Sequence, residues 1–210
     1  PEDVGNSRNI VVSDQSGKSN IISRLKTIGI EIKETDPKIK KLLEEVKDRE
    51  FIGYSYDGAD ASFELLARRI IGEIPRYILI KEYDVSVKKN SSGKIISLAK
   101  AQLEVDGEKI ICKGEGNGPV NALDNAIRQN VDRLSKYSEY LKDLKLVDYK
   151  VRILDTGTEA VTRVSIESTD SKGKNWFTIG VSANIIDASF KALVDSLDYK
   201  LFKDKAPASL

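Results

Sequence analysis

A pattern of three strands followed by a helix occurs twice in the chain, and this repeat constrains the fold more than any other feature of the sequence. Each copy has three segments in which apolar and polar residues alternate, as in half-buried strands, and then a segment with a helical period. The expected elements are strands at 77–88, 95–105 and 108–113 with a long helix from Pro119 through Leu134, then strands at 149–154, 161–168 and 176–181 with a helix at 184–199. We therefore expect an α+β fold with two tandem β-β-β-α units.

Matching residues of the two copies lie at a constant spacing of 66 positions. The spacing joins Tyr83 to Tyr149, Val87 to Ile153, Ala122 to Ala188 and Ala126 to Ala192. Tandem copies of this kind can pair their sheets or pack their helices about a pseudo-twofold axis. The seam between such copies is a natural place for a small-molecule site.

The first third of the chain has the pattern of three short amphipathic helices after an opening strand at 10–12. Ser19 or Asn20 is expected to cap the first helix. The pair Asp36-Pro37 is expected to start the second helix, with the aspartate as cap and the proline at the first helical position. The third helix is expected over 60–71, before a glycine that ends it.

The composition excludes several classes of chemistry. The 210 residues include no histidine and one cysteine, which excludes imidazole-based catalysis, histidine ligation of a metal, an intramolecular disulfide and a CxxC pair. The 34 basic and 33 acidic side chains leave a formal charge of +1, without the basic excess that a nucleic-acid partner requires. No apolar run reaches the roughly 18 residues of a membrane span. We expect a cytoplasmic protein with no membrane partner and, because it starts at Pro1, a piece of a longer chain.

Two short motifs resemble catalytic signatures but lack a required residue. Gly17-Lys18-Ser19 matches the end of a phosphate-binding P-loop, yet the position that requires a glycine is Val12. Cys112 lies in a predicted strand, and the chain has no histidine to activate its thiol. We interpret the first motif as a turn with a helix cap and the cysteine as a packed thiol.

An acidic group at Asp57, Asp60 and Glu64 is the basis of an alternative hypothesis, a stand-alone enzyme. Asp60 and Glu64 lie one helical turn apart and could form an acid pair. Acidic residues are common in first turns because they interact favourably with the helix dipole. A solvated cap is therefore the favoured interpretation, and no metal site is expected.

The turns that lead into the two repeat helices are the candidate ligand site. A glycine-rich turn lets backbone N–H groups approach a ligand, and a helix N-terminus favours an anion such as a carboxylate. Asn121 and Asp187 could receive an ammonium, and branched side chains around them could form apolar walls. The candidate residues are Gly116, Asn117, Gly118, Pro119, Asn121 and Ala122 in the first turn, and Val181, Ser182, Asn184, Ile185, Ile186, Asp187 and Ala188 in the second. These groups together describe a pocket for a free amino acid, although such turns also begin helices that bind nothing.

The same stretches resemble the C-terminal regulatory domain shared by 2-isopropylmalate synthase and citramalate synthase. The second copy is the more specific one and is similar to the citramalate synthase branch. The segments that carry the resemblance are the glycine-rich 114–124, then 148–154, 178–189 and 192–201 in the second copy, and 5–6, 12–21 and 61–66 upstream, where the family has linker subdomains. The resemblance covers nearly the whole chain.

The resemblance implies helical linker subdomains at 1–74, a two-repeat regulatory and dimerising domain at 75–203, and a frayed tail at 204–210. It implies a homodimer that binds a branched-chain amino acid, isoleucine or leucine, as feedback inhibitor at the subunit interface. It also implies a catalytic barrel of the same polypeptide, which uses acetyl-CoA and a divalent metal that this chain is not expected to hold. Asn121 stands where the family commonly has an acidic residue, so Asp187 is the better ammonium candidate.

Two functional hypotheses therefore remain beside the stand-alone enzyme. In the first, the chain is an allosteric effector domain, and ligand binding acts on the catalytic part through the short helices of 19–71. Such coupling typically amounts to about 1–3 kcal/mol of differential affinity. In the second, the chain is a ligand-free dimerisation scaffold whose glycine turns are purely structural.

Overall fold

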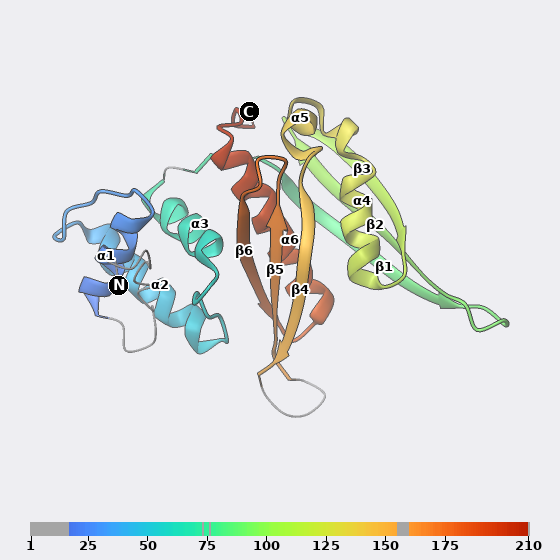
Figure 1. The fold of residues 1–210 in the computed structure, drawn as a ribbon, viewed down its shortest axis with the longest axis horizontal. Coiled ribbons are helices and arrows are strands. Elements are labelled where there is room, and N and C mark those ends of the chain that lie inside the picture. The colour runs from blue at the N-terminus through green and yellow to red at the C-terminus, as the bar shows by residue number, and fades with distance from the viewer. Residues whose placement is uncertain (1–16, 73, 76, 155–159, 210) are drawn as a thin grey trace.

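The structure is a computed structural model that describes residues 17–72, 74–75, 77–154 and 160–209. In these residues a group of three helices precedes two three-stranded sheets, each followed by its own helix (Figure 1). The helices are α1 (Lys18–Thr27), α2 (Pro37–Phe51), α3 (Asp60–Ile71), α4 (Pro119–Arg128), α5 (Ser138–Leu141) and α6 (Ile185–Lys203), with a 3₁₀ helix at Val131–Tyr137. The strands are β1 (Leu79–Lys89), β2 (Ile95–Val105), β3 (Glu108–Gly116), β4 (Lys145–Ile153), β5 (Thr162–Thr169) and β6 (Asn175–Ser182). The predicted α+β class and the two β-β-β-α units are confirmed.

The three N-terminal helices, which we call the helical group, pack around a small core of their own, as their apolar spacing predicts. Asp36 caps α2, because its Oδ1 accepts a hydrogen bond from the backbone N–H of Lys38 at 2.8 Å. Pro37 occupies the first helical position, as predicted. The fully buried members of this core include Ile21, Leu25, Ile39, Leu42, Val46, Phe63 and Ala67.

The first helix begins earlier than the sequence predicts. α1 starts at Lys18 with Gly17 as its N-cap, so the expected cap at Ser19 or Asn20 is wrong. The carbonyl oxygen of Gly17 already accepts the Asn20 N–H at 3.0 Å, which closes the first turn without a side-chain cap. The expected strand at 10–12 lies outside the described residues.

Both sheets are antiparallel, and their strands are ordered as in the sequence. The Asp106-Gly107 turn between β2 and β3 has positive φ at both residues, 52° and 77°, as a type I′ turn requires. Each first strand has a β-bulge, between Ile80 and Glu82 in β1 and between Leu146 and Asp148 in β4. These bulges lie at equivalent positions of the repeat, so the two units share backbone detail as well as element order.

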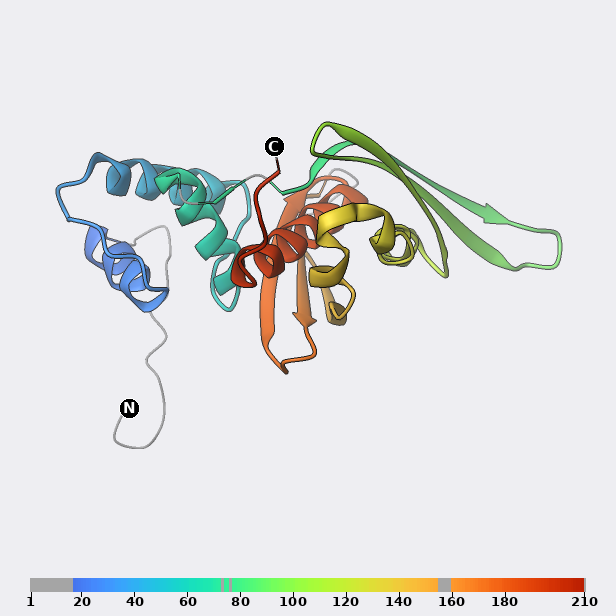
Figure 2. The same cartoon turned by 90° about the horizontal axis from the view of Figure 1, so that it is seen from above.

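One helix covers one face of each sheet. α4 packs on the first sheet (β1, β2 and β3) and α6 on the second (β4, β5 and β6), and the two helices contact each other (Figure 1). Residues of both sheets and both helices form one continuous core. It includes Cys112, which is fully buried, and burial raises the pKa of its thiol, as expected of a packed cysteine. The β1–β2 hairpin continues well beyond the helices (Figure 2).

The helix after the first sheet is shorter than its apolar spacing predicts. α4 ends before Asn130, and Val131 and Leu134 lie in the following 3₁₀ helix, although both remain buried. The side-chain amide of Asn130 donates to the carbonyl oxygen of Ala126 at 2.8 Å. In a continuing α-helix the Asn130 backbone N–H would donate to that same oxygen. It donates instead to the carbonyl oxygen of Ile127, at 3.1 Å.

A cluster of polar contacts holds α3 against the second unit. Ser62 of α3 accepts the Ile179 N–H of β6 at 3.0 Å and donates to Asp195 of α6 at 3.1 Å. Arg69 of α3 forms salt bridges with Asp195 and Asp198 of α6, each at 2.9 Å. We call these four side chains, Ser62, Arg69, Asp195 and Asp198, the α3–α6 junction.

The C-terminal segment is docked on the first unit. The Tyr137 hydroxyl donates to the carbonyl oxygen of Pro207 at 3.0 Å, and the Lys136 ammonium donates to that of Ala208 at 2.6 Å. Ala206 is buried in the common core. The expectation of a frayed tail is therefore wrong for residues 204–209, because the first unit supplies side-chain donors for their carbonyl oxygens.

Candidate functional site

The first glycine-rich turn joins β3 to α4 and leaves the helix without a side-chain cap at its N-cap residue, Gly118. Asn117 donates its backbone N–H to Oδ1 of Asn121 at 3.2 Å. A Cβ on Gly116 would lie 2.6 Å from the Ala122 nitrogen, so packing requires this glycine. A Cβ on Gly118 would meet nothing within 4 Å. Gly118 and the uncapped N–H groups that follow it are therefore the part of this turn that an anion can approach.

The second turn, between β6 and α6, is capped by its own side chains. Oδ1 of Asn184 accepts the N–H groups of Ile186 at 2.8 Å and of Asp187 at 3.4 Å. Oγ of Ser182 in turn accepts the Asn184 N–H at 3.1 Å. The start of α6 therefore offers an anion fewer unsatisfied donors than the start of α4 does.

Asp187 is charged and already has hydrogen-bonding partners. The Tyr83 hydroxyl donates to its Oδ1 at 3.3 Å, and the Lys191 ammonium lies 2.8 Å from its Oδ2. Burial alone would raise the pKa of Asp187, but hydrogen bonds from Lys191, Ser182 and Tyr83 outweigh it and lower that pKa. A ligand ammonium would therefore share this carboxylate with Lys191.

The two equivalent tyrosines of the repeat both reach α6. The Tyr149 hydroxyl lies 2.8 Å from Oγ of Ser189 within its own unit. Tyr83 instead crosses to the other unit, where it bonds Asp187 and packs its ring 4.4 Å from that of Phe190, centroid to centroid. This cross-unit contact was not predicted, because it depends on how the two units pack rather than on either unit alone.

Three of the candidate residues are buried and support the turns from within. Ala122 and Ala188 are fully buried on the helix faces that approach the sheets. Val181 is also buried and faces the loop after α2. The exposed candidates are Asn117, Asn121, Asn184 and Ile185, and those of intermediate exposure are Gly116, Gly118, Pro119, Ser182, Ile186 and Asp187.

The ends of β1 and β4 carry exposed apolar side chains. Val87 is 55% exposed and Ile153 is 67% exposed, and the two occupy equivalent positions of the repeat. Because side chains alternate along a strand, they lie on the same strand faces as Tyr83 and Tyr149. Ile185, in the second candidate turn, is a further exposed apolar residue. Among the residues that the structure describes, each unit thus presents an exposed apolar strand end.

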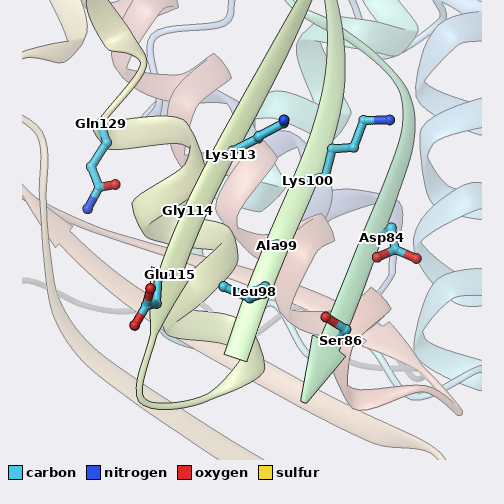
Figure 3. Close-up of a pocket in the computed structure, with 9 residues that line it drawn as sticks. All are labelled: Asp84, Ser86, Leu98, Ala99, Lys100, Lys113, Gly114, Glu115 and Gln129. Atoms are coloured by element: carbon cyan, nitrogen blue, oxygen red, sulfur yellow. The ribbon is translucent and has the colours of Figure 1, made fainter. Parts of the chain in front are cut away.

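The outer face of the first sheet holds an open cavity of about 410 Å³ next to the first turn (Figure 3). Its lining carries both signs of charge, with Asp84 and Glu115 beside Lys100 and Lys113. Opposite charges interspersed on an exposed strand face are typical of a solvated surface. Among the cavities found in the described residues, none is lined by both candidate turns.

Structural ion pairs occupy the alternative acidic site. Asp60 lies 2.6 Å from Arg24, and Glu64 is buried with its carboxylate 2.8 Å from the Lys203 ammonium. Asp57 is exposed in the loop before α3. Over the described ranges, no group of three or more histidine, cysteine, aspartate or glutamate side chains is placed to hold a metal ion. The enzyme hypothesis gains no support from these contacts.

Residues 57–201 match the family model of the LeuA allosteric (dimerisation) domain. The chain belongs to this family. The matched range runs from just before α3 into α6, so the LeuA dimerisation domain includes both β-β-β-α units, both candidate turns and the α3–α6 junction.

Several proteins that are similar to this chain are named enzymes. The chain is 45% identical over 208 residues to the (R)-citramalate synthase of Aquifex aeolicus, covering 98% of this chain and 39% of that protein. It is 43% identical to the (R)-citramalate synthase of Geobacter sulfurreducens, with the same coverage, and 40% identical to that of Synechocystis, covering 96% of this chain and 37% of that protein. The chain thus spans about two fifths of the length of these relatives. Within the part that the structure describes, no helix is long and apolar enough to cross a membrane.

Proposed function

We propose that this chain is the allosteric domain of a citramalate synthase-type acyltransferase of branched-chain amino acid biosynthesis in the cytoplasm. Two copies pair through the ends of β1 and β4 and bind isoleucine or leucine at the interface as feedback inhibitor. The observation that carries the proposal is the exposure of Val87 and Ile153 at equivalent positions of the two units. Apolar residues left uncovered on a folded chain favour association, and a second copy is the simplest partner for a repeated surface.

The ligand would bind groups of both turns, because neither turn supplies all of them. Its carboxylate is received by the uncapped N–H groups after Gly118, where the helix dipole favours a negative charge. Its ammonium is received by Asp187, and its aliphatic side chain lies against Ile185 and the end of β4. Because no described cavity joins the two turns within one chain, the second copy completes the site.

The remainder of the enzyme carries the chemistry in this proposal. Acetyl-CoA and a divalent metal would be bound by the catalytic barrel, since the described residues offer no cluster of metal ligands. The similarity to (R)-citramalate synthases supports this division, because those proteins are more than twice the length of the chain.

A ligand-free dimerisation scaffold is the second candidate function, and the glycine packing favours it. Gly114, Gly116 and Gly180 all lie so close to helix backbone that a Cβ would clash. Their presence is explained by packing alone and requires no ligand. Within the first turn, Gly118 lacks such an explanation.

Calorimetric titration with isoleucine, leucine and valine, combined with light scattering, tests both candidates. We expect the wild-type chain to be a dimer that binds at least one of the three amino acids. We expect Val87→Asp and Ile153→Asp to be monomers that give no heat of binding from the interface site. Val147→Asp is the matched control, because Val147 is also exposed on β4 but corresponds to a charged residue, Lys81, in the first unit. A folded dimer that gives no heat with any amino acid supports the scaffold, and a monomer at all concentrations contradicts the pairing.

A further inference from the structure

A second cavity, of about 460 Å³, lies where the helical group meets the two units. The helical group contributes Arg49, Tyr54 and Arg69 to its walls, and the units contribute residues of β1, β6 and α6. Its volume falls within the range of about 300–1,000 Å³ that is typical of small-molecule sites. All of its walls belong to one chain, so it exists without a second copy.

Six of the eleven residues that line the cavity are apolar or aromatic, and the other five, which include Lys191 and Asp195, are charged. Small-molecule sites typically combine such a wall with a few polar groups that fix the orientation of the ligand. The apolar and aromatic lining residues are Tyr54, Ile80, Tyr83, Ile179, Phe190 and Val194. A wall of this composition suits an aliphatic group.

Arg49 provides a cationic group at the helical side of the cavity. Its Nε donates to Glu45 at 2.6 Å, and its guanidinium lies 5.5 Å from the centroid of the Tyr54 ring. Burial raises the pKa of the neighbouring Tyr56 hydroxyl, and the Arg49 guanidinium opposes that rise through its charge and a hydrogen bond. Among the described residues no carboxylate other than Glu45 pairs with Arg49, whereas both terminal nitrogens of Arg69 are used by the α3–α6 junction. The forked arrangement of the Arg49 donors matches a carboxylate.

Asp187 provides an anionic group at the α6 side of the same cavity. The Lys191 ammonium lies 2.8 Å from its Oδ2, the Tyr83 hydroxyl makes a longer contact of 3.3 Å with its Oδ1, and Ser182 also donates to it. An ionised carboxylate has about four acceptor positions, so it can accept further donors. The cavity therefore offers an acceptor for an ammonium as well as donors for a carboxylate.

We infer that this cavity is a second binding site, for a free amino acid with an aliphatic side chain. The carboxylate of the ligand binds Arg49, its ammonium binds Asp187, and its side chain packs against Phe190 and Val194. The site shares Asp187 with the interface site proposed above, so a ligand in one site competes with a ligand in the other for that carboxylate. It differs from the interface site because a single chain supplies every group. Since its walls come from both the helical group and the second unit, an occupied cavity links the two.

The test uses the full 210-residue chain carrying Ile153→Asp, which is monomeric if the interface proposal holds. It is titrated with leucine, with 4-methylpentanoate, which lacks the ammonium, and with 3-methylbutylamine, which lacks the carboxylate. We expect leucine to bind with 1:1 stoichiometry and at least tenfold more tightly than either analogue, because each charged hydrogen bond contributes substantially. Equal affinity for leucine and for an analogue would contradict the assignment of both charges.

Two further substitutions in the same background locate the site. Val194→Trp fills the cavity and is expected to abolish leucine binding, and Arg49→Gln is expected to weaken it at least tenfold. Lys40→Gln is the control for Arg49→Gln, because it removes the same charge from α2 at a side chain that is 82% exposed. Circular dichroism checks that each variant folds. If Val194→Trp does not fold, the comparison of leucine binding by Arg49→Gln and Lys40→Gln shows whether leucine binds in the cavity.

The inference is overturned if the Ile153→Asp chain does not bind leucine, or if Arg49→Gln and Lys40→Gln bind it equally. Its failure is distinguishable from failure of the proposed function. A dimeric wild type whose heat disappears in the Ile153→Asp chain supports the interface site and contradicts the cavity. Leucine binding that persists in a monomer and is lost in Arg49→Gln supports the cavity, whatever the outcome at the interface.

Discussion

Gly114 in β3 and Gly180 in β6 occupy the same position in the two repeats and make the same contact with the helix of their unit. A Cβ on Gly114 would clash with the carbonyl oxygen of Ala122, at 2.6 Å, and with the nitrogen of Ala126. A Cβ on Gly180 would clash with the equivalent atoms, the carbonyl oxygen of Ala188 and the nitrogen of Ala192, the latter at 2.9 Å. Neither glycine has a positive φ, so close packing, and not backbone conformation, excludes a side chain. The repeat thus fixes how near each helix lies to its sheet.

Substitution of either glycine is expected to destabilise the fold. Gly180→Ala and Gly114→Ala force the helix away from the strand, and overpacking of this kind typically costs about 1–3 kcal/mol. Urea unfolding measures the change in the free energy of unfolding. Gly118→Ala is the control, because its Cβ would meet nothing within 4 Å, and we expect it to cost less than about 1 kcal/mol, through the weaker N-cap preference of alanine alone. Equal effects at Gly118 and Gly180 would contradict the packing argument.

The starts of α4 and α6 are expected to respond in opposite ways to changes of their caps. Asn184→Ala removes the acceptor of two backbone N–H groups and should cost about 1 kcal/mol in urea unfolding. Gly118→Ser adds a cap where none exists and should raise stability by a few tenths of a kcal/mol. If the start of α4 receives the carboxylate of the effector, Gly118→Ser also weakens isoleucine binding in calorimetry. Unchanged binding would exclude that role.

The features that the sequence predicted are those set by local rules. The repeat predicted both β-β-β-α units, and the order of elements is as expected. Asp36-Pro37 predicted the start of α2, and Asp106-Gly107 predicted the turn between β2 and β3, because each dipeptide favours one backbone conformation. The early end of α4 was missed because the Asn130 side chain takes a carbonyl oxygen that the apolar spacing assigns to the helix.

The features that could not be predicted depend on packing between distant segments. The contact between Tyr83 and Asp187 joins residues in different units, and nothing in either local sequence indicates it. The junction of Arg69 with Asp195 and Asp198 similarly requires α3 to lie on α6. Sequence therefore located the candidate turns but not their neighbours, and the cavity at the helical group depends on those neighbours.

The stability of the fold is expected to depend on pH through Asp198. Burial is the main cause that raises the pKa of Asp198 to about 6, and the neighbouring Asp195 raises it further, although Arg69 opposes both. The folded chain then holds a proton that the unfolded chain loses near pH 4. This contribution to stability is present at low pH and is lost as the pH rises from about 4 to about 6.

Asp198→Asn removes the contribution of Asp198, because asparagine stays neutral, and leaves that of Asp195, whose pKa is also raised by burial. Relative to the wild type, the free energy of unfolding of the variant should rise by about 3 kcal/mol between pH 4 and pH 7, measured by urea unfolding at each pH. Asp204→Asn is the opposite control. Burial alone would raise the pKa of Asp204, but hydrogen bonds from Lys172 and Lys200 lower it, so its contribution is lost as the pH falls below about 4. If the free energy of unfolding changed with pH in the same way in both variants, the opposite pKa shifts assigned to Asp198 and Asp204 would be contradicted.

Ser62 is expected to transmit effector binding from the second unit to the helical group. It is buried and bonds both β6 and α6, so a shift of α6 on ligand binding acts directly on α3. Hydrogen exchange should show slower exchange in α3 when isoleucine saturates the chain. Ser62→Ala leaves the Ile179 N–H without its partner, costs about 1–3 kcal/mol of stability and should reduce that change in exchange while isoleucine still binds. Binding without any change of exchange in α1, α2 or α3 would show that the helical group does not carry the signal.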